Sequence, residues 1–261
     1  MPSTKPILIL QLRPEDATAE SEYQRILTYG QLNAEDTCRF RIEHNGIPEN
    51  LDLDHYAAII VGGSPFDIST ANHKKTDIQK KIEADFQRLL EQVVKRDFPF
   101  FGACSGNGLL GHYLGAPITT RYGEAVGCVT LDITNEGKQD KLLKDFPPRI
   151  DVLLGHKEAC DVVPEGATLL MTGSQCPVQM FRVGDNIYAT QFHPEADPEE
   201  FALRIDIYAN HGYFEPQEAE ALKAASNKPT PHAQEILRRF VAWYFKEKRE
   251  SDLISFPTQR E

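Results

Sequence analysis

The sequence predicts an α/β fold in which an open, mostly parallel sheet carries helices on both faces. In the first part of the chain, short apolar runs alternate with charged stretches of helical periodicity, as expected for buried strands joined by crossover helices. The later apolar runs indicate antiparallel strands rather than helices, and these would form a β-rich extension of the sheet. Charged helical patterns return in a C-terminal segment.

Strands are expected where short apolar runs are bounded by turn residues, at 7–12, 38–42, 56–61, 98–101, 126–133, 168–171, 180–183 and 186–192. Helices are expected where apolar residues recur at helical spacing, at 15–33, 77–95 and 232–248, with a further helix opening at Ser105. Helices therefore separate the early strands, which is how parallel strands are connected.

The C-terminal part differs in character, so we expect a main domain at 1–196 and a helical extension at 197–261 packed on it. Asn227-Lys-Pro-Thr-Pro231 interrupts the helical patterns of the extension. Its last helix carries one apolar stripe, made up of Ile236, Leu237, Phe240, Val241, Tyr244 and Phe245. The stripe must be buried, either on the chain's own domain or at the interface of a homodimer or another partner. Residues 250–261 are expected to form a frayed tail.

The composition describes an acidic globular protein. The 261 residues are 41% apolar and 26% charged, which is enough to build a large core. The net charge of −11 argues against nonspecific binding to nucleic acid or to an anionic membrane, because both need basic patches. No long apolar segment appears, and the run at 7–10 is too short for a signal peptide. We therefore expect a cytoplasmic protein.

Cys104 is the most informative residue of the chain. Gly102-Ala-Cys-Ser-Gly106 follows the strand expected at 98–101, and flanking glycines are how a strand passes a nucleophile to a helix through a sharp turn. The turn would display the thiol, and the N-terminus of the helix opening at Ser105 would favour its thiolate form. The alternative is a small packing cysteine in a glycine-rich turn.

His193 and Glu195 supply the groups that such a thiol needs. The run at 186–192 stops at His193 because Pro194 cannot continue a strand ladder. A cysteine nucleophile requires a base, and the base requires a third group that fixes its tautomer. Alone, His193 would be read as an ordinary strand-end histidine. Together with the cysteine turn, His193 and Glu195 predict a Cys-His-Glu triad.

These two motifs resemble those of the class I glutamine amidotransferases, in the same order and with similar separation. The run Ala57-Ala-Ile-Ile-Val-Gly-Gly-Ser-Pro65 is similar to the family's strand and Gly-Gly loop. The stretches at 155–158, 163–170 and 176–181 resemble segments of the amidotransferase domain of GMP synthetase and its free-standing relatives. The resemblance covers about residues 55–196 and implies a flavodoxin-like sheet.

The resemblance also implies roles for individual residues. Gly63 and Ser105 would donate the backbone N–H groups of an oxyanion hole. The residues expected to bind substrate are Gly62, Gly108, Tyr122, Gly123 and Gln179. The charged residues after the Gly-Gly loop, Asp67, His73, Lys74 and Lys75, are interpreted as solvated, with a place at the pocket mouth as the alternative.

The chain departs from the family pattern at two positions. Gly106-Asn-Gly108 stands where relatives usually carry His-Gln or Met-Gln after the turn, so a glutamine side chain that helps to hold the substrate is missing. Val178 stands where relatives commonly carry asparagine, although Gln179 is retained. We expect either a wider pocket or a site adapted to something other than free glutamine.

The implied reaction is hydrolysis of the glutamine side-chain amide through a cysteinyl thioester, giving glutamate and ammonia. A separate ammonia-accepting synthase is a candidate partner. One alternative is a γ-glutamyl hydrolase that acts on a γ-glutamyl amide or peptide. The other is a non-catalytic binding module on the same fold.

No cofactor or metal is expected. The chain has no phosphate-binding Gly-x-x-x-x-Gly-Lys-[Ser/Thr] pattern, so ATP binding is not indicated. Its five cysteines contain no Cys-x-x-Cys pair and are odd in number, which fits a reducing compartment. The dispersed histidines show no metal-ligand spacing.

Overall fold

The computed structural model describes residues 3–209 and 214–245. Within them, one nine-stranded sheet has the order β2-β1-β3-β4-β11-β10-β9-β6-β7, and β5 pairs with β8 in a small second sheet. The strands are β1 Ile7–Gln11, β2 Thr37–Arg41, β3 Ala58–Val61, β4 Phe100–Ala103, β5 Ile118–Thr119, β6 Glu124–Ile133, β7 Arg149–His156, β8 Ala159–Cys160, β9 Ala167–Thr172, β10 Met180–Val183 and β11 Ile187–Thr190.

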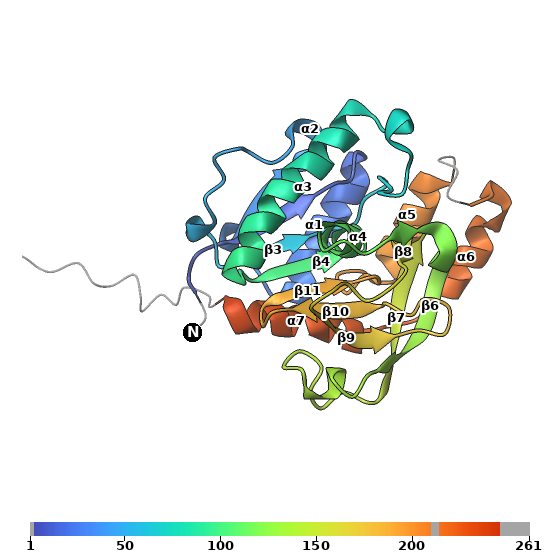
Figure 1. Cartoon of the computed structure of the whole chain (residues 1–261). Coiled ribbons are helices and arrows are strands. Elements are labelled where there is room, and N and C mark those ends of the chain that lie inside the picture. Colours follow the sequence, from blue (N-terminus) through green and yellow to red (C-terminus); the bar gives the residue numbers. More distant parts are fainter. Residues whose placement is uncertain (1–2, 210–213, 246–261) are drawn as a thin grey trace, which may run out of the picture.

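The nine-stranded sheet has a parallel part and an antiparallel part (Figure 1). The first five strands in its order, β2 to β11, pair in parallel. From β11 onward each pairing is antiparallel. The predicted α/β fold, with its open sheet and β-rich extension, is confirmed. Because β3, β4 and β11 are parallel neighbours, their carboxyl ends meet at one edge of the sheet.

Helices lie on both faces of the sheet. They are α1 Asp16–Gly30, α2 Ile42–Asn45, α3 Asp77–Arg96, α4 Ser105–Tyr113, α5 Pro198–Tyr208, α6 Ala219–Ser226 and α7 Pro231–Tyr244. Successive residues of β1 point to opposite faces. Ile7 and Ile9 pack in the core that contains α1 and α7, whereas Leu8 and Leu10 pack in the core that contains α3 and α4.

The apolar stripe of the last helix lies inside the chain's own core. Its six residues are at most 9% exposed, and the ring of Phe240 lies 5.2 Å from that of Phe101 on β4. The Phe240 ring also lies 6.2 Å from that of Tyr188 on β11. The stripe is therefore not available for a dimer interface. The domain boundary predicted between residues 196 and 197 stays a prediction.

Most expected elements are present with ends shifted by a few residues, and three strands, β5, β7 and β8, were not expected. β7 pairs along β6, with Val152 opposite Val129, but polar Arg149 and Asp151 interrupt its apolar run. The tail expected at 250–261 lies outside the described residues. In the described part of the chain, no helix combines the length and the apolarity needed to cross a membrane.

Candidate active site

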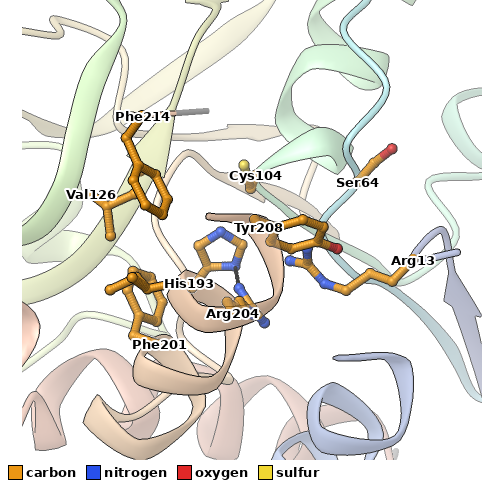
Figure 2. A pocket seen from close by; sticks show the side chains of 11 residues that line it. Arg13, Ser64, Cys104, Val126, His193, Phe201, Arg204, Tyr208 and Phe214 are labelled. Carbon is orange, nitrogen blue, oxygen red and sulfur yellow. Dashed lines mark hydrogen bonds between the residues drawn. The ribbon is translucent and has the colours of Figure 1, made fainter. Parts of the chain in front are cut away.

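The carboxyl ends of three parallel strands bring the predicted site together. Gly62 and Gly63 follow β3, Cys104 follows β4, and His193 lies three residues after β11. Cys104 and His193 line the same cavity, and Figure 2 shows the sulfur above the imidazole ring. The loop and strand-end positions that the sequence singled out are thus close in space.

Cys104 sits on the sharp turn that its flanking glycines predict. Its backbone has φ 52° and ψ −91°, a conformation that a residue with a side chain rarely adopts. The Cys104 N–H donates to Thr190 O at 2.7 Å, which ties the turn to β11. A Cβ at Gly102 would lie 2.8 Å from the backbone of Gly106, so the turn closes only with glycine there.

The thiol of Cys104 is protonated in the resting site. The residue is half-buried, and burial raises the pKa of the thiol to about 12, which outweighs the opposing charges of Arg13 and Arg204. The thiolate expected from the nearby helix N-terminus is therefore not the resting form. Gln191 Nε2 lies 3.9 Å from Sγ and is the hydrogen-bond partner of the sulfur. A base is needed to remove the proton.

His193 and Glu195 form a buried pair suited to that task. His193 Nδ1 lies 2.7 Å from Glu195 Oε1, and both side chains are nearly inaccessible to solvent. Because a carboxylate only accepts, Nδ1 carries the proton and Nε2 is left to accept one. Burial lowers the pKa of His193, so the imidazole is neutral at rest. Burial alone would raise the pKa of Glu195, but the charges of His193 and Arg204 lower it to about 2.

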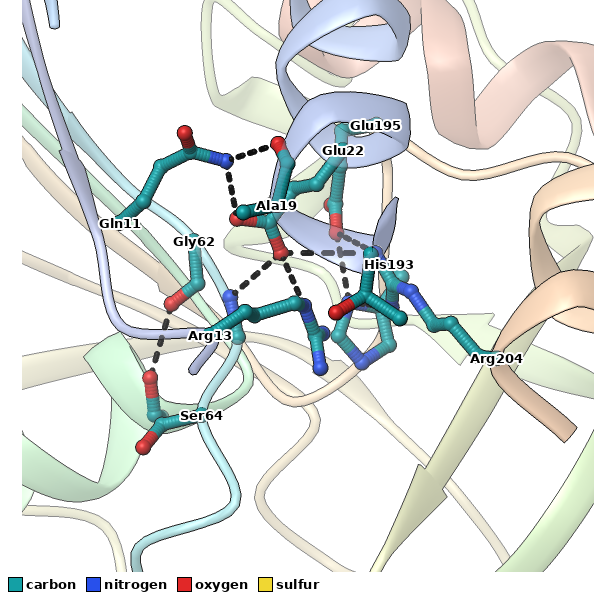
Figure 3. A network of polar contacts seen from close by, with 12 residues as sticks. Gln11, Arg13, Ala19, Glu22, Gly62, Ser64, His193, Glu195 and Arg204 are labelled. Carbon is teal, nitrogen blue, oxygen red and sulfur yellow. Dashed lines mark hydrogen bonds and ion pairs between the residues drawn. The ribbon is translucent and has the colours of Figure 1, made fainter. Parts of the chain in front are cut away.

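A buried network behind His193 and Glu195 was missed by sequence reasoning (Figure 3). Arg204 on α5 places Nη1 3.1 Å from His193 Nδ1, and its Nη2 donates to Glu195 Oε1 at 3.2 Å and to Glu22 Oε2 at 3.5 Å. Its Nε donates to Glu200. The guanidinium therefore fixes the carboxylate that fixes the histidine, so Arg204 is a positioning residue.

Glu22 reaches the loop expected to form the oxyanion hole. Its Oε2 accepts the Gly63 N–H at 3.2 Å and Arg13 Nε at 2.6 Å. A Cβ at Gly62 would lie 2.2 Å from Glu22 Oε1, so only glycine admits this carboxylate. The Gly63 N–H is thus already hydrogen-bonded to Glu22 in the resting site. Its neighbour Ser64 lines the cavities on both sides of Cys104.

Cys104 lies between two cavities. One, here called the Glu158 cavity, is lined by residues that include Phe66, Asp67, Ser105, Gly108, Glu158 and Gln191. The other, here called the α5 cavity, is lined by residues that include Arg13, Val126, Phe201, Ile205, Tyr208 and Phe214. A group bonded to the sulfur could therefore extend in two directions.

The Glu158 cavity carries two carboxyl groups. Glu158 accepts the backbone N–H groups of Ile68 and Ser69, each at 2.7 Å. Asp67 lines the same cavity. Burial and the charge of Glu158 raise the pKa of Asp67, and the charge of Lys157 opposes this shift. A Cβ at Gly108 would lie 3.3 Å from Ile68 Cδ1, so Ile68 borders the space left by the missing glutamine.

The other residues expected to bind substrate lie at or behind the cavities. Ser105 lines the Glu158 cavity, and its Oγ donates to Gly62 O at 2.8 Å. Gln179 is buried, and its Nε2 donates to Glu124 Oε2 at 2.5 Å. Tyr122 and Gly123 are not among the described residues that line either cavity. A Cβ at Gly123 would lie 2.7 Å from Lys157 O, which is a packing reason for that glycine.

Among the described residues, one buried group has the chemistry of metal ligands. Ligand atoms of Glu124, His156 and Cys176 lie within 4.8 Å of one another. Each of them already has a protein partner: His156 Nε2 lies 3.0 Å from Glu124 Oε2, and Cys176 Sγ donates to Val178 O at 3.7 Å. These contacts satisfy the three side chains within the protein.

One signal for the missed residues was present in the sequence. Arg13 follows the first strand, and side chains at the carboxyl ends of parallel strands face the ligand site. Gln191 stands two residues before His193 in the same strand-end segment. Glu22 and Arg204 lie within helices α1 and α5, where a charged residue is normally solvated, and nothing local distinguishes them.

Comparison with known proteins agrees with this geometry. The family model described as "Glutamine amidotransferase class-I" matches residues 29–213. A GMP synthase (glutamine-hydrolyzing) of Wolbachia pipientis wMel is 29% identical over 121 residues, which are 44% of this chain and 23% of that protein. This chain thus spans about a quarter of the length of that relative.

A second relative is matched over nearly its whole length. Gamma-glutamyl peptidase 3 of Arabidopsis thaliana is 26% identical over 240 residues, which are 85% of this chain and 90% of that protein. Among solved structures, a glutamine amidotransferase of Thermotoga maritima superposes with a TM-score of 0.66 at 20% identity, covering 90% of this chain and 98% of that one. The structural likeness shows the shared fold.

Proposed function

The chain belongs to the class-I glutamine amidotransferase family, and from that premise we propose that it hydrolyses γ-glutamyl amide bonds through a thioester on Cys104. The observation that carries the proposal is a cysteine on a strained strand-to-helix turn, facing a neutral histidine whose Nδ1 is held by Glu195. Glutamine is the simplest substrate with such a bond. The Glu158 cavity, with Asp67 and Glu158, suits the α-ammonium group of a glutamyl residue.

The proposed steps use only groups in this site. Cys104 Sγ attacks the γ-carbonyl carbon while His193 Nε2 takes the thiol proton. The imidazolium then gives that proton to the departing nitrogen, the C–N bond breaks, and the γ-glutamyl thioester remains. Water attacks the thioester, its proton passes through His193, and the C–S bond breaks to release glutamate and the thiol. Glu195 stabilises the imidazolium in both halves.

Backbone N–H groups near the sulfur would stabilise the tetrahedral oxyanion. The Ser105 N–H remains a proposed donor. Gly63 can serve as the second only after its N–H leaves Glu22, to which it donates at rest. The N–H of Ser64, one residue on, is the alternative donor, because Ser64 borders Cys104 in both cavities.

The second candidate function is hydrolysis of a γ-glutamyl bond whose leaving group is larger than ammonia. The α5 cavity would be unnecessary for glutamine, whose leaving group is ammonia, and its presence favours a γ-glutamyl amide or peptide. The near-complete length match to a gamma-glutamyl peptidase supports the same direction. If glutamine is the substrate, an ammonia-accepting synthase would be a separate partner, in line with the glutamine-hydrolyzing synthase relative.

The test measures glutamate and ammonia released from L-glutamine, and p-nitroaniline released from γ-glutamyl p-nitroanilide. We expect Cys104→Ala to lose at least about 10⁴-fold in turnover, because no thioester can form. Cys38→Ala, which changes a half-buried cysteine on β2, is the matched control and should retain activity. Equal turnover by wild type and Cys104→Ala, or none by wild type, would contradict the proposal and favour a binding module.

A further inference from the structure

The α5 cavity is apolar on one side and carries a charged group, Arg13, on the other. Val126, Phe201, Ile205 and Phe214 contribute apolar surface, and Arg13 lies at the opposite side (Figure 2). The space between its walls and at its mouth amounts to about 530 Å³, open solvent included. Cys104 and His193 border it, so any group that fills it lies next to the reacting atoms.

The terminal guanidinium nitrogens of Arg13 are available as hydrogen-bond donors in this cavity. The residue is 5% exposed, and its Nε donates to Glu22 Oε2 at 2.6 Å. No described residue accepts a hydrogen bond from its two terminal nitrogens. Arg204 differs, because its Nε donates to Glu200 and its Nη2 donates to Glu195 and Glu22. Of the two arginines in the cavity wall, Arg13 is therefore the one with both terminal nitrogens available to a ligand.

Arg13 also lies at the right place relative to the histidine. A Cβ at Gly63 would lie 2.2 Å from Arg13 Nη2 and 2.9 Å from His193 Cε1, so the guanidinium and the imidazole flank the same glycine. His193 must reach the leaving nitrogen. In an amino-acid leaving group the carboxylate is two bonds from that nitrogen, and the guanidinium fork matches a carboxylate.

We propose that the α5 cavity is the leaving-group site for a γ-glutamyl peptide whose second residue is an apolar amino acid. The carboxylate of that residue binds the terminal nitrogens of Arg13, and its side chain packs against Val126, Phe201 and Ile205. The inference rests on the proposed function and specifies its substrate class. Bond cleavage gives glutamate and a free apolar amino acid, with the proton of the new amine supplied by His193.

The experiment compares kcat/KM for four substrates with the same γ-glutamyl part. γ-Glutamyl-leucine has both the carboxylate and the apolar side chain, and γ-glutamyl-isoamylamide lacks only the carboxylate. γ-Glutamyl-glycine lacks the side chain, and L-glutamine lacks both. In wild type we expect γ-glutamyl-leucine to exceed the isoamylamide by about tenfold to a hundredfold, the usual range for a hydrogen bond to a charged group. It should also exceed γ-glutamyl-glycine, because burying apolar surface is favourable.

Arg13→Met should bring the ratio between leucine and isoamylamide substrates close to one, and the ratio is insensitive to how much of the variant folds. Val126→Phe, which fills the apolar wall, should lower the ratio between leucine and glycine substrates. Equal wild-type turnover of all four substrates would overturn the leaving-group site and leave the proposed function standing. Absence of turnover for all four in wild type would overturn both.

Discussion

Cys104 and His193 meet as a neutral pair, since burial raises the pKa of the thiol to about 12 and lowers the pKa of the imidazole. A thiolate–imidazolium pair would be ready to attack before substrate arrives. In the proposed mechanism the proton moves from Sγ to Nε2 only when substrate is attacked. The strained backbone conformation of Cys104 costs about 1–3 kcal/mol, and the surrounding strands hold the backbone in that conformation.

This protonation state predicts how Cys104 reacts with iodoacetamide in the absence of substrate. Because alkylation requires the thiolate, the rate should rise about tenfold per pH unit from pH 6 to pH 9, without a plateau. The rate is followed by mass spectrometry of the Cys104 peptide. Cys104→Ser should lose this modification and Cys38→Ala should retain it. A rate that levels off by pH 7 would indicate an ion pair and contradict the neutral assignment.

At the scale of elements, two helices of the C-terminal segment have different roles. α5 begins at Asp197, whose side chain accepts the Glu200 N–H at 2.9 Å, with Pro198 in its first turn. This start sets the position of Arg204 behind His193 and Glu195 and of Phe201 and Ile205 in the α5 cavity. α7 instead buries its stripe against the sheet. One helix completes the site and the other completes the core.

The role of α7 predicts a large loss of stability on truncating its central ring. Phe240 contacts the rings of Phe101, Tyr188 and Tyr244 and is fully buried. Phe240→Ala should lower the free energy of unfolding by about 3–5 kcal/mol, measured by urea denaturation. Trp243 on the same helix is 52% exposed, and Trp243→Ala should cost about 1 kcal/mol or less. Similar losses in the two variants would argue against burial of the stripe.

At the scale of the whole molecule, the site joins elements that are far apart in the sequence. Glu22 comes from α1, Arg204 from α5, and Gly63 lies between them in sequence, yet the three are joined by hydrogen bonds. Several buried charged side chains lie close together around Arg204. Burial raises the pKa of Glu200 from 4.5 to about 7, although Arg204 opposes the shift. Folding therefore favours the protonated form of this carboxyl.

Glu200 should make the protein less stable as the pH rises. Between pH 4.5 and about 7 the folded state keeps a proton that the unfolded state has released, so the free energy of unfolding falls with increasing pH. The opposite contribution of Glu195, whose pKa is lowered to about 2, is complete above pH 4.5. The two effects occupy separate pH windows.

We expect wild type to lose about 1–3 kcal/mol more than Glu200→Gln between pH 5 and pH 8, measured by urea denaturation at both values. Glu199→Gln is the matched control, because the Glu199 side chain is 85% exposed and should leave the difference unchanged. Equal pH dependence in wild type and Glu200→Gln would show that Glu200 titrates normally.

Local sequence patterns were sufficient to predict the fold class and the candidate triad. Apolar runs and turn residues predicted the parallel strands, and the glycines around Cys104 predicted the turn that the backbone adopts. Strand β7 was missed because Arg149 and Asp151 interrupt its apolar run, and only pairing with β6 identifies it. The identities of Cys104, His193 and Glu195 as candidates came from motifs that lie within a few residues of each strand end.

The sequence by itself therefore determined the fold class, the strained cysteine turn and the triad candidates, because each depends on neighbours along the chain. Tertiary structure alone decided which groups surround them. Arg13, Glu22 and Arg204 reach the site from distant elements, and the commitment of the Gly63 N–H and the high thiol pKa follow from their contacts and from burial. Burial and charge depend on distances in space, which no local pattern specifies.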